Sequence, residues 1–101
     1  MLKLFIKPEA ENDLEKIYLF SIENWGLRQA EKYQDDLFEG MQLISKTPKL
    51  GKVYPFSIQE YRKYHVNRHL IFYRIDSKKC EIIRILHDSM DLRKALVHIE
   101  N

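Results

Sequence analysis

The hydrophobic period of this chain changes once, near Pro48, and that change limits the folds open to it. Before Pro48 the apolar residues recur every three or four positions, as they do along one face of a helix. After Pro48 they alternate with polar residues or form short β-branched runs, which is typical of strands. Helices followed by strands predict an α+β fold, in which the two kinds of element cover each other's apolar faces.

The helical half is expected to form two antiparallel helices that turn at Gly26. A short strand is predicted over residues 2–7, and Pro8 suits the first position of a helix, where its missing N–H costs no hydrogen bond. Apolar residues mark one face of each helix: Ala10, Leu14, Ile17, Tyr18 and Trp25 in the first, and Ala30, Tyr33, Leu37, Met41 and Ile44 in the second. Pro48 ends the second helix, because the residue before a proline disfavours the helical conformation. Trp25 is expected to be buried and to hold the helices to each other or to the sheet.

The second half is expected to form a loop and then an antiparallel meander. The loop is marked by Pro48, Gly51 and Pro55. Three strands are predicted, over residues 61–67, 70–75 and 81–86. The polar turn at residues 76–79 is short enough to place the last two strands side by side.

A short C-terminal helix is expected after the last strand. Its apolar face consists of Leu92, Ala95, Leu96 and Ile99. Asp88 or Ser89 suits its N-cap, and Asp91 completes a weak capping box. The predicted fold is α+β, a single domain spanning residues 1–101: a two-helix antiparallel hairpin packed on a small twisted, mainly antiparallel β-sheet, with a short C-terminal helix. The helices are expected on one face of the sheet, leaving the other face less covered and available to a partner.

The net charge of +2 is unevenly distributed along the chain. Residues 1–47 hold six Lys or Arg against nine Asp or Glu, about −3, and residues 48–101 hold eleven against six, about +5. The basic half is either a surface for an acidic partner, nucleic acid or protein, or a solvated face. Cys80 is the only cysteine and cannot form an intrachain disulfide. This fits a reducing compartment, and with no leader-like or membrane-spanning pattern it indicates a cytoplasmic protein with no membrane role.

Four arginines lie on or beside the predicted strands: Arg62, Arg68, Arg74 and Arg84. An arginine within a strand needs solvent, a carboxylate or an anionic ligand beside it, because burying it unpaired is costly. The four predict either an anion-facing surface or structural pairs with acids such as Glu60, Asp76, Asp88, Asp35 and Asp36. The histidines at positions 65, 69, 87 and 98 do not combine with other residues into a metal-ligand set, so neither a metal nor another cofactor is expected.

His87 ends the last predicted strand, and two interpretations of it are open. With Arg62, Arg68 and Arg84 it could form the site of a metal-independent ribonuclease, the histidine moving a proton and the arginines stabilising the phosphorane. Alternatively, it stands at a strand end and hydrogen-bonds the neighbouring turn, just before a helix cap. The residues alone favour the second interpretation.

The chain resembles the ParE toxins of the RelE/ParE superfamily over residues 2–96. Three segments carry the similarity: EAENDLEKIYLFSIENWGLRQAEKY, EYRKYHVNRHLIFYRI and RILHDSMD. The resemblance implies the toxin component of a type II toxin–antitoxin system, often labelled plasmid stabilisation. Toxins similar to ParE are expected to cause growth arrest as non-enzymatic inhibitors of DNA gyrase and to be neutralised by a cognate ParD-like antitoxin. Operator DNA is expected to be bound by the antitoxin, so that this chain reaches it only indirectly.

The same resemblance leaves a second activity open. RelE-like relatives are ribosome-dependent mRNA endoribonucleases, and under that alternative His87 with the arginines at 62, 68 and 84 would be catalytic. After His87, however, this chain has Asp88 and Asp91 and no tyrosine, and acids at that rim would repel RNA phosphates. Gyrase inhibition is therefore the favoured activity, and no catalytic residue is assigned. The residues expected to bind the target or the antitoxin are Arg62, Arg68, Arg74, Arg84 and His87.

Overall fold

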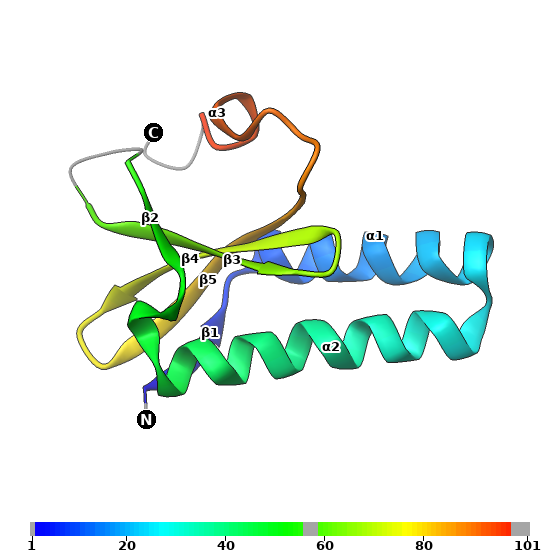
Figure 1. Ribbon diagram of the computed structural model, residues 1–101, viewed down its shortest axis with the longest axis horizontal. Helices are drawn as coiled ribbons and strands as arrows, with labels where there is room; N and C mark the ends of the chain where they lie inside the picture. The colour runs from blue at the N-terminus through cyan, green and yellow to red at the C-terminus, as the bar shows by residue number, and fades with distance from the viewer. Residues whose placement is uncertain (1, 56–58, 98–101) are drawn as a thin grey trace.

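The computed structural model describes residues 2–55 and 59–97 (Figure 1). Its elements are, in chain order, β1 (Lys3–Ile6), α1 (Pro8–Trp25), α2 (Leu27–Lys46), the 3-10 turn η1 (Pro48–Leu50), β2 (Lys52–Tyr54), β3 (Tyr61–Val66), β4 (His69–Asp76), β5 (Lys79–His87) and α3 (Leu92–Ala95). Figure 1 shows α1 and α2 side by side as a hairpin beside the sheet. The predicted α+β fold is confirmed. Ile99, expected on the face of the C-terminal helix, lies outside the described residues.

The five strands form one sheet in the order β1-β5-β4-β3-β2. The last four strands are antiparallel neighbours, as predicted for a meander, whereas β1 pairs with β5 in parallel. β2 stands where the sequence predicted only a loop, and its residues pair with residues 61–63 of β3. Three residues carry too little alternation to be recognised as a strand from their pattern, and β2 forms because β3 offers it a hydrogen-bonding edge.

The main core lies between the helical hairpin and the sheet. Its buried members are Ala10, Leu14, Leu37, Met41, Ile44, Ile71, Tyr73, Cys80, Ile82 and Ile85. A smaller cluster fills the other face of the sheet: Tyr61, Phe72, Ile83, Leu86 and Leu96. The second cluster corrects one expectation, because the C-terminal segment partly covers the sheet face that was expected to be available to a partner. Leu96, which is fully buried, follows α3 and packs against Phe72 and its neighbours there.

Beyond the end of β1, the side chain of Asp13 in α1 forms hydrogen bonds with β5. β1 pairs with β5 only as far as Ile6 and Ile82. Farther along β5, the Oδ2 atom of Asp13 accepts a hydrogen bond from the main-chain N–H of Ile85 at 2.9 Å. The same carboxylate accepts two hydrogen bonds from Arg84, at 2.7 Å from Nε and 3.0 Å from Nη2, and these bonds raise the pKa of Arg84 further above its usual value. This bidentate pair fixes α1 to β5.

The C-terminal helix begins later than predicted. Its N-cap is Asp91, which accepts hydrogen bonds from the main-chain N–H groups of Arg93 at 3.1 Å and Lys94 at 3.4 Å. The predicted caps, Asp88 and Ser89, instead lie in a turn that follows β5 directly. The side chain of Asp88 is therefore available for contacts with the sheet.

Asp13→Asn is expected to lower the free energy of unfolding by about 3 kcal/mol, because it leaves the half-buried guanidinium of Arg84 without its counter-charge. Denaturation by urea, followed by circular dichroism, measures the change. The matched control is Glu15→Gln, an exposed carboxylate of the same helix, which should stay within about 0.5 kcal/mol of the unmodified protein. Equal midpoints for the two variants would contradict the role given to Asp13.

Candidate functional site

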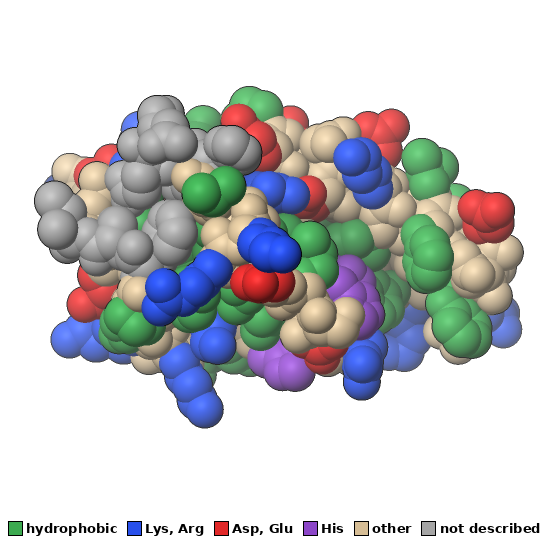
Figure 2. All heavy atoms as spheres, turned by 90° about the horizontal axis from the view of Figure 1, so that it is seen from above, with side chains coloured by type: hydrophobic (Ala, Val, Ile, Leu, Met, Phe, Trp, Pro, Cys, Tyr) green, Lys and Arg blue, Asp and Glu red, His purple; other side chains and the backbone are tan. Residues whose placement is uncertain are grey.

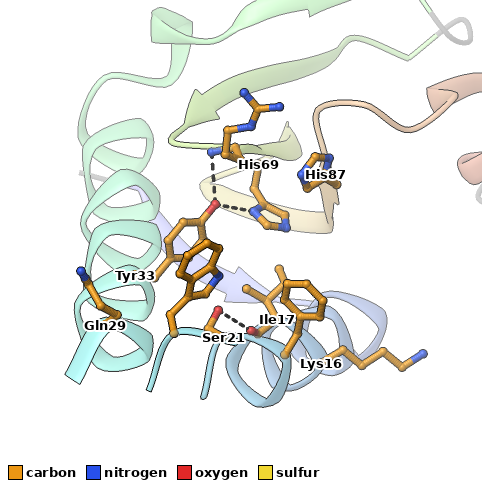
Figure 3. A pocket seen from close by; sticks show the side chains of 10 residues that line it. Lys16, Ile17, Ser21, Gln29, Tyr33, His69 and His87 are labelled. Carbon is orange, nitrogen blue, oxygen red and sulfur yellow. Dashed lines mark hydrogen bonds between the residues drawn. The ribbon is translucent and has the colours of Figure 1, made fainter. Parts of the chain in front are cut away.

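A groove of about 750 Å³ lies between the helical hairpin and one end of the sheet (Figure 3). α1 supplies Lys16, Ile17, Phe20, Ser21 and Trp25 to its lining, α2 supplies Gln29 and Tyr33, and the end of the sheet supplies Arg68, His69 and His87. His69 begins β4 and His87 ends β5, and the two stand opposite each other in the strand register. The groove thus forms where the helices pass the end of the sheet.

The aromatic wall of the groove corrects the expectation for Trp25. The sequence predicts a buried side chain, but Trp25 is 70% exposed, and Phe20, which also lines the groove, is 62% exposed. The helical stripe keeps its spacing as far as Trp25, yet Figure 1 shows that the hairpin extends past the end of the sheet. Figure 2 shows apolar side chains gathered over this projecting end. An apolar surface of this kind is typical of a binding site.

Tyr33 and His69 form a directed hydrogen-bond chain on the floor of the groove (Figure 3). The hydroxyl of Tyr33 accepts the main-chain N–H of Arg68 at 3.1 Å and lies 2.5 Å from Nδ1 of His69. Because a main-chain N–H can only donate, the hydroxyl proton of Tyr33 is free to be donated to Nδ1. Burial, and then the neighbouring His87, lowers the pKa of His69 from 6.5 to about 4, and burial also raises the pKa of Tyr33. His69 is therefore a neutral imidazole at pH 7.

His87 is held by the turn that follows it, as the second interpretation of this residue predicted. Its Nδ1 atom accepts the main-chain N–H of Ser89 at 3.1 Å and lies 2.7 Å from the Ser89 hydroxyl. Asp88 is 3.5 Å from the same Nδ1, but an atom that accepts from Ser89 has no proton to give to a carboxylate. Asp88 instead meets Nε2 of His65 at 3.0 Å and Arg68 at 3.6 Å.

The four arginines do not form one surface. Arg62 stands opposite Tyr73, and Arg74 stands opposite Tyr61 and Glu81. Adjacent positions of one strand point to opposite faces of a sheet, so Arg62 and Arg74 lie on different faces. Only the strand register, which the sequence does not reveal, separates them.

Three of the four arginines are bound within the chain. Arg62 donates to Glu60 at 2.9 Å and to the carbonyl of Gly51 at 2.7 Å. Arg74 donates to Glu81 at 2.7 Å and to Gln59, and Arg84 is held by Asp13 as described above. Arg68 differs, because its side chain is 70% exposed and its ion pair with Asp88 is long. Of the five predicted site residues, the structure brings Arg68 and His87 together in the groove.

Tyr33, His69 and the exposed aromatics are the site residues that the sequence did not single out. Tyr33 and Trp25 were assigned to apolar stripes, and His69 was considered only as a metal ligand. Within residues 2–55 and 59–97, no group of three His, Cys, Asp or Glu is placed to hold a metal ion. His98, weighed with the other histidines, lies outside the described residues. Among the helices of the described segments, none is long and apolar enough to cross a membrane.

Comparison with known proteins identifies the family that this chain is similar to. Residues 4–92 match the family model described as the ParE toxin of a type II toxin–antitoxin system, parDE. The chain is 34% identical over 91 residues to Toxin ParE1 of Caulobacter vibrioides, which covers 90% of this chain and 94% of that protein. It is 28% identical over 95 residues to Toxin ParE1 of Mycobacterium tuberculosis, which covers 93% and 97%.

Solved structures share the fold. A chain of the chromosomal ParDE system of P. aeruginosa aligns with a TM-score of 0.75 at 22% identity, covering 86% of this chain and 96% of that one. A chain of the RelBE2 toxin–antitoxin complex of Mycobacterium tuberculosis aligns with a TM-score of 0.66 at 18% identity, covering 85% and 96%. At these identities the likeness is one of fold.

Trp25→Ala is expected to change the free energy of unfolding by less than about 0.5 kcal/mol, because the side chain is mostly in solvent already. The contrasting variant is Leu37→Ala, which empties a fully buried position of α2 and should cost about 2–5 kcal/mol. Thermal denaturation of both variants measures the difference. A loss of stability in Trp25→Ala as large as that in Leu37→Ala would restore the buried placement.

His69 is expected to titrate far below the ordinary histidine value of 6.5, with a midpoint at about 4. Because the folded protein disfavours the charged ring, the stability that this shift supplies is complete above pH 6.5 and is lost as the pH falls toward 4. Proton NMR of the His69 ring measures the midpoint. Tyr33→Phe should raise it, because the neutral ring then loses its hydrogen-bond donor. A midpoint at 6.5 in the unmodified protein would contradict the buried neutral ring.

Proposed function

This chain belongs to the ParE toxin family of type II toxin–antitoxin systems, and on that basis we propose that it inhibits DNA gyrase and is neutralised by a cognate ParD-like antitoxin. The proposal assigns it to the cytoplasm, where DNA is replicated. Plasmid stabilisation is the proposed role of the toxin and antitoxin together, with operator DNA bound only through the antitoxin. The solved neighbours come from a ParDE system and a RelBE2 toxin–antitoxin complex, which supports a protein antitoxin as partner.

The pairing of the arginines is the observation that favours gyrase inhibition over RNA cleavage. A metal-independent ribonuclease needs an acid and a base and also cations that are free to stabilise the phosphorane. Arg84 is neutralised by the carboxylate of Asp13, and Arg62 by that of Glu60. The carboxylate of Asp88, next to His87 in the chain, lies beside Arg68 as well. This arrangement supports a protein that binds its target without cutting RNA.

Arg68 and His87 remain the proposed contact residues of the groove for the target or the antitoxin. We propose that Arg62, Arg74 and Arg84 act differently from the sequence expectation. Each hydrogen-bonds an acid of the same chain, so each would support the surface rather than contact the partner. A loss of toxicity in Arg84→Ala would therefore have to be separated from a loss of folding, because Asp13 would be left unpaired.

His87→Gln is expected to keep toxicity, because glutamine retains an N–H donor but cannot shuttle a proton. Induction of the chain without an antitoxin, scored by growth arrest and by gyrase-dependent DNA cleavage, measures the effect. Primer extension on a translated message runs in parallel. Under the ribonuclease alternative, loss of an acid or base would lower the cleavage rate by about 10²–10⁴-fold.

Growth arrest accompanied by gyrase-dependent DNA cleavage, in both the unmodified chain and His87→Gln, would support the proposal. Codon-specific mRNA cleavage that disappears in His87→Gln would overturn it and make the strand end an active site. The purified chain should also block supercoiling by purified gyrase in the absence of ribosomes. Failure of that assay with folded protein would reject gyrase as the target.

A further inference from the structure

We propose that the groove binds a carboxylate from an amphipathic segment of a partner protein, through the Nε2–H groups of His69 and His87 beside Arg68. The antitoxin is the partner to which this applies, and to that extent the inference rests on the proposed function. The aromatic wall would hold the apolar residues of the segment, and the histidines and Arg68 would select an acidic residue among them.

The tautomer of His69 follows from the direction of its hydrogen bonds. The main-chain N–H of Arg68 donates to the hydroxyl of Tyr33, which leaves the hydroxyl proton for Nδ1 of His69, 2.5 Å away, and we assign Nδ1 as the acceptor of that proton. A neutral imidazole that accepts at Nδ1 carries its proton on Nε2. The low pKa of His69 agrees with a neutral ring.

The tautomer of His87 follows in the same way. The main-chain N–H of Ser89 donates to Nδ1 of His87, so a neutral His87 carries its proton on Nε2 as well. Within the described segments, neither Nε2 atom has a hydrogen-bond acceptor, and the one buried polar side-chain atom left without a partner is Oε1 of Gln34. The two Nε2–H groups are therefore within reach of solvent or a ligand.

The two rings are close enough to serve one ligand. Their centroids are 5.3 Å apart, the rings are nearly perpendicular at 82°, and both line the groove. Figure 3 shows His69 and His87 as neighbours at the end of the sheet. A carboxylate offers two acceptor oxygens, one for the N–H donor of each of these neighbouring rings.

The charge of the groove also fits an acidic residue. Lys16 and Arg68 lie along it, and its lining includes no Asp or Glu among the described residues. Arg68 is mostly exposed, and its long contact of 3.6 Å with Asp88 leaves donors of the guanidinium for a ligand. The lining is otherwise mainly apolar, which suits an amphipathic helix that presents apolar anchors around the acid.

A protein segment fits this surface better than RNA does. Binding of RNA relies on several phosphate contacts, and the lining supplies two cations, Lys16 and Arg68. RNA and a second copy of this chain are therefore alternatives for the experiment to exclude.

The tautomers are tested first, by long-range ¹H–¹⁵N NMR of the histidine rings in the full chain at pH 7. Both His69 and His87 should show the pattern of a ring protonated at Nε2. A ring protonated at Nδ1 in either residue would overturn the inference, because its groove-facing nitrogen would then accept rather than donate.

Ligand selection is tested with a library of random 12-residue peptides displayed on phage and selected on the full chain. The recovered peptides should share an Asp or Glu flanked by apolar residues. The best peptide and its amide counterpart, with Gln for Glu or Asn for Asp, are then titrated against Trp25 fluorescence, which reports on the groove because this is the only tryptophan. The acidic peptide should bind about 10–100-fold more tightly, as expected for hydrogen bonds to a charged group.

Substitutions at His87 test whether the preference for the acidic peptide over its amide counterpart depends on the histidine donor. His87→Phe should lose most of the preference for the acidic peptide, because it keeps a ring but removes the donor, whereas His87→Gln should retain it. Lys52→Ala, which removes an exposed lysine of β2 outside the groove, is the control and should bind like the unmodified chain. Circular dichroism of each variant shows that it is folded.

Equal binding of the acidic and amide peptides, or a recovered set without an acid, would overturn the inference. Tighter binding of a single-stranded RNA oligonucleotide than of the acidic peptide would also overturn it. A concentration-dependent shift of Trp25 fluorescence in the chain alone would do the same, because it would indicate that a second copy of the chain occupies the groove. These measurements do not involve gyrase. A negative gyrase assay would leave them unchanged, so the two proposals can fail separately.

Discussion

The carboxylate of Asp13 is the contact on which the relation between helices and sheet depends. β1 ends at Ile6, and without Asp13 the main-chain N–H of Ile85 would stand at an unpaired strand edge beside α1. By accepting that N–H and the fork of Arg84 together, one side chain fixes both the height and the rotation of α1 against β5. Because β5 ends at His87, the same contact sets the distance between that histidine and the groove residues of α1.

The length of the hairpin beyond the sheet then creates the groove. In α1 the residues that face the sheet are buried up to Ser21, and the next position of that stripe, Trp25, emerges into solvent. The apolar residues of this stripe stabilise the core where the sheet covers them. Beyond the end of the sheet they are exposed and available to bind a partner. Tyr33 marks the boundary, because its ring packs at the edge of the core while its hydroxyl ties α2 to the start of β4.

The sequence predicted the kinds of element and the fold, because these follow from hydrophobic period, which is local. It did not predict the features that depend on the register of the strands or on how far the sheet extends along the helices. The period assigned Trp25 to the correct face but could not tell how far the sheet extends. Arg62 and Arg74 were grouped because their strands are adjacent, and only the register separates them. The cap moved to Asp91 because an additional turn follows β5, a choice that the string of small polar residues there leaves open.

The low pKa of His69 favours recognition over proton transfer at this ring. A general acid or base must exchange its proton during each turnover, and it works best with a pKa near the ambient pH. The Nδ1 atom of His69 is hydrogen-bonded to the hydroxyl of Tyr33. The pKa of His69 is about 4, so this ring does not take up a proton at neutral pH. The Nδ1 atom of His87 is occupied by Ser89. In the proposed binding mode each ring presents an Nε2–H donor to the groove, and such a pair of donors discriminates between ligands by the acceptors they bring.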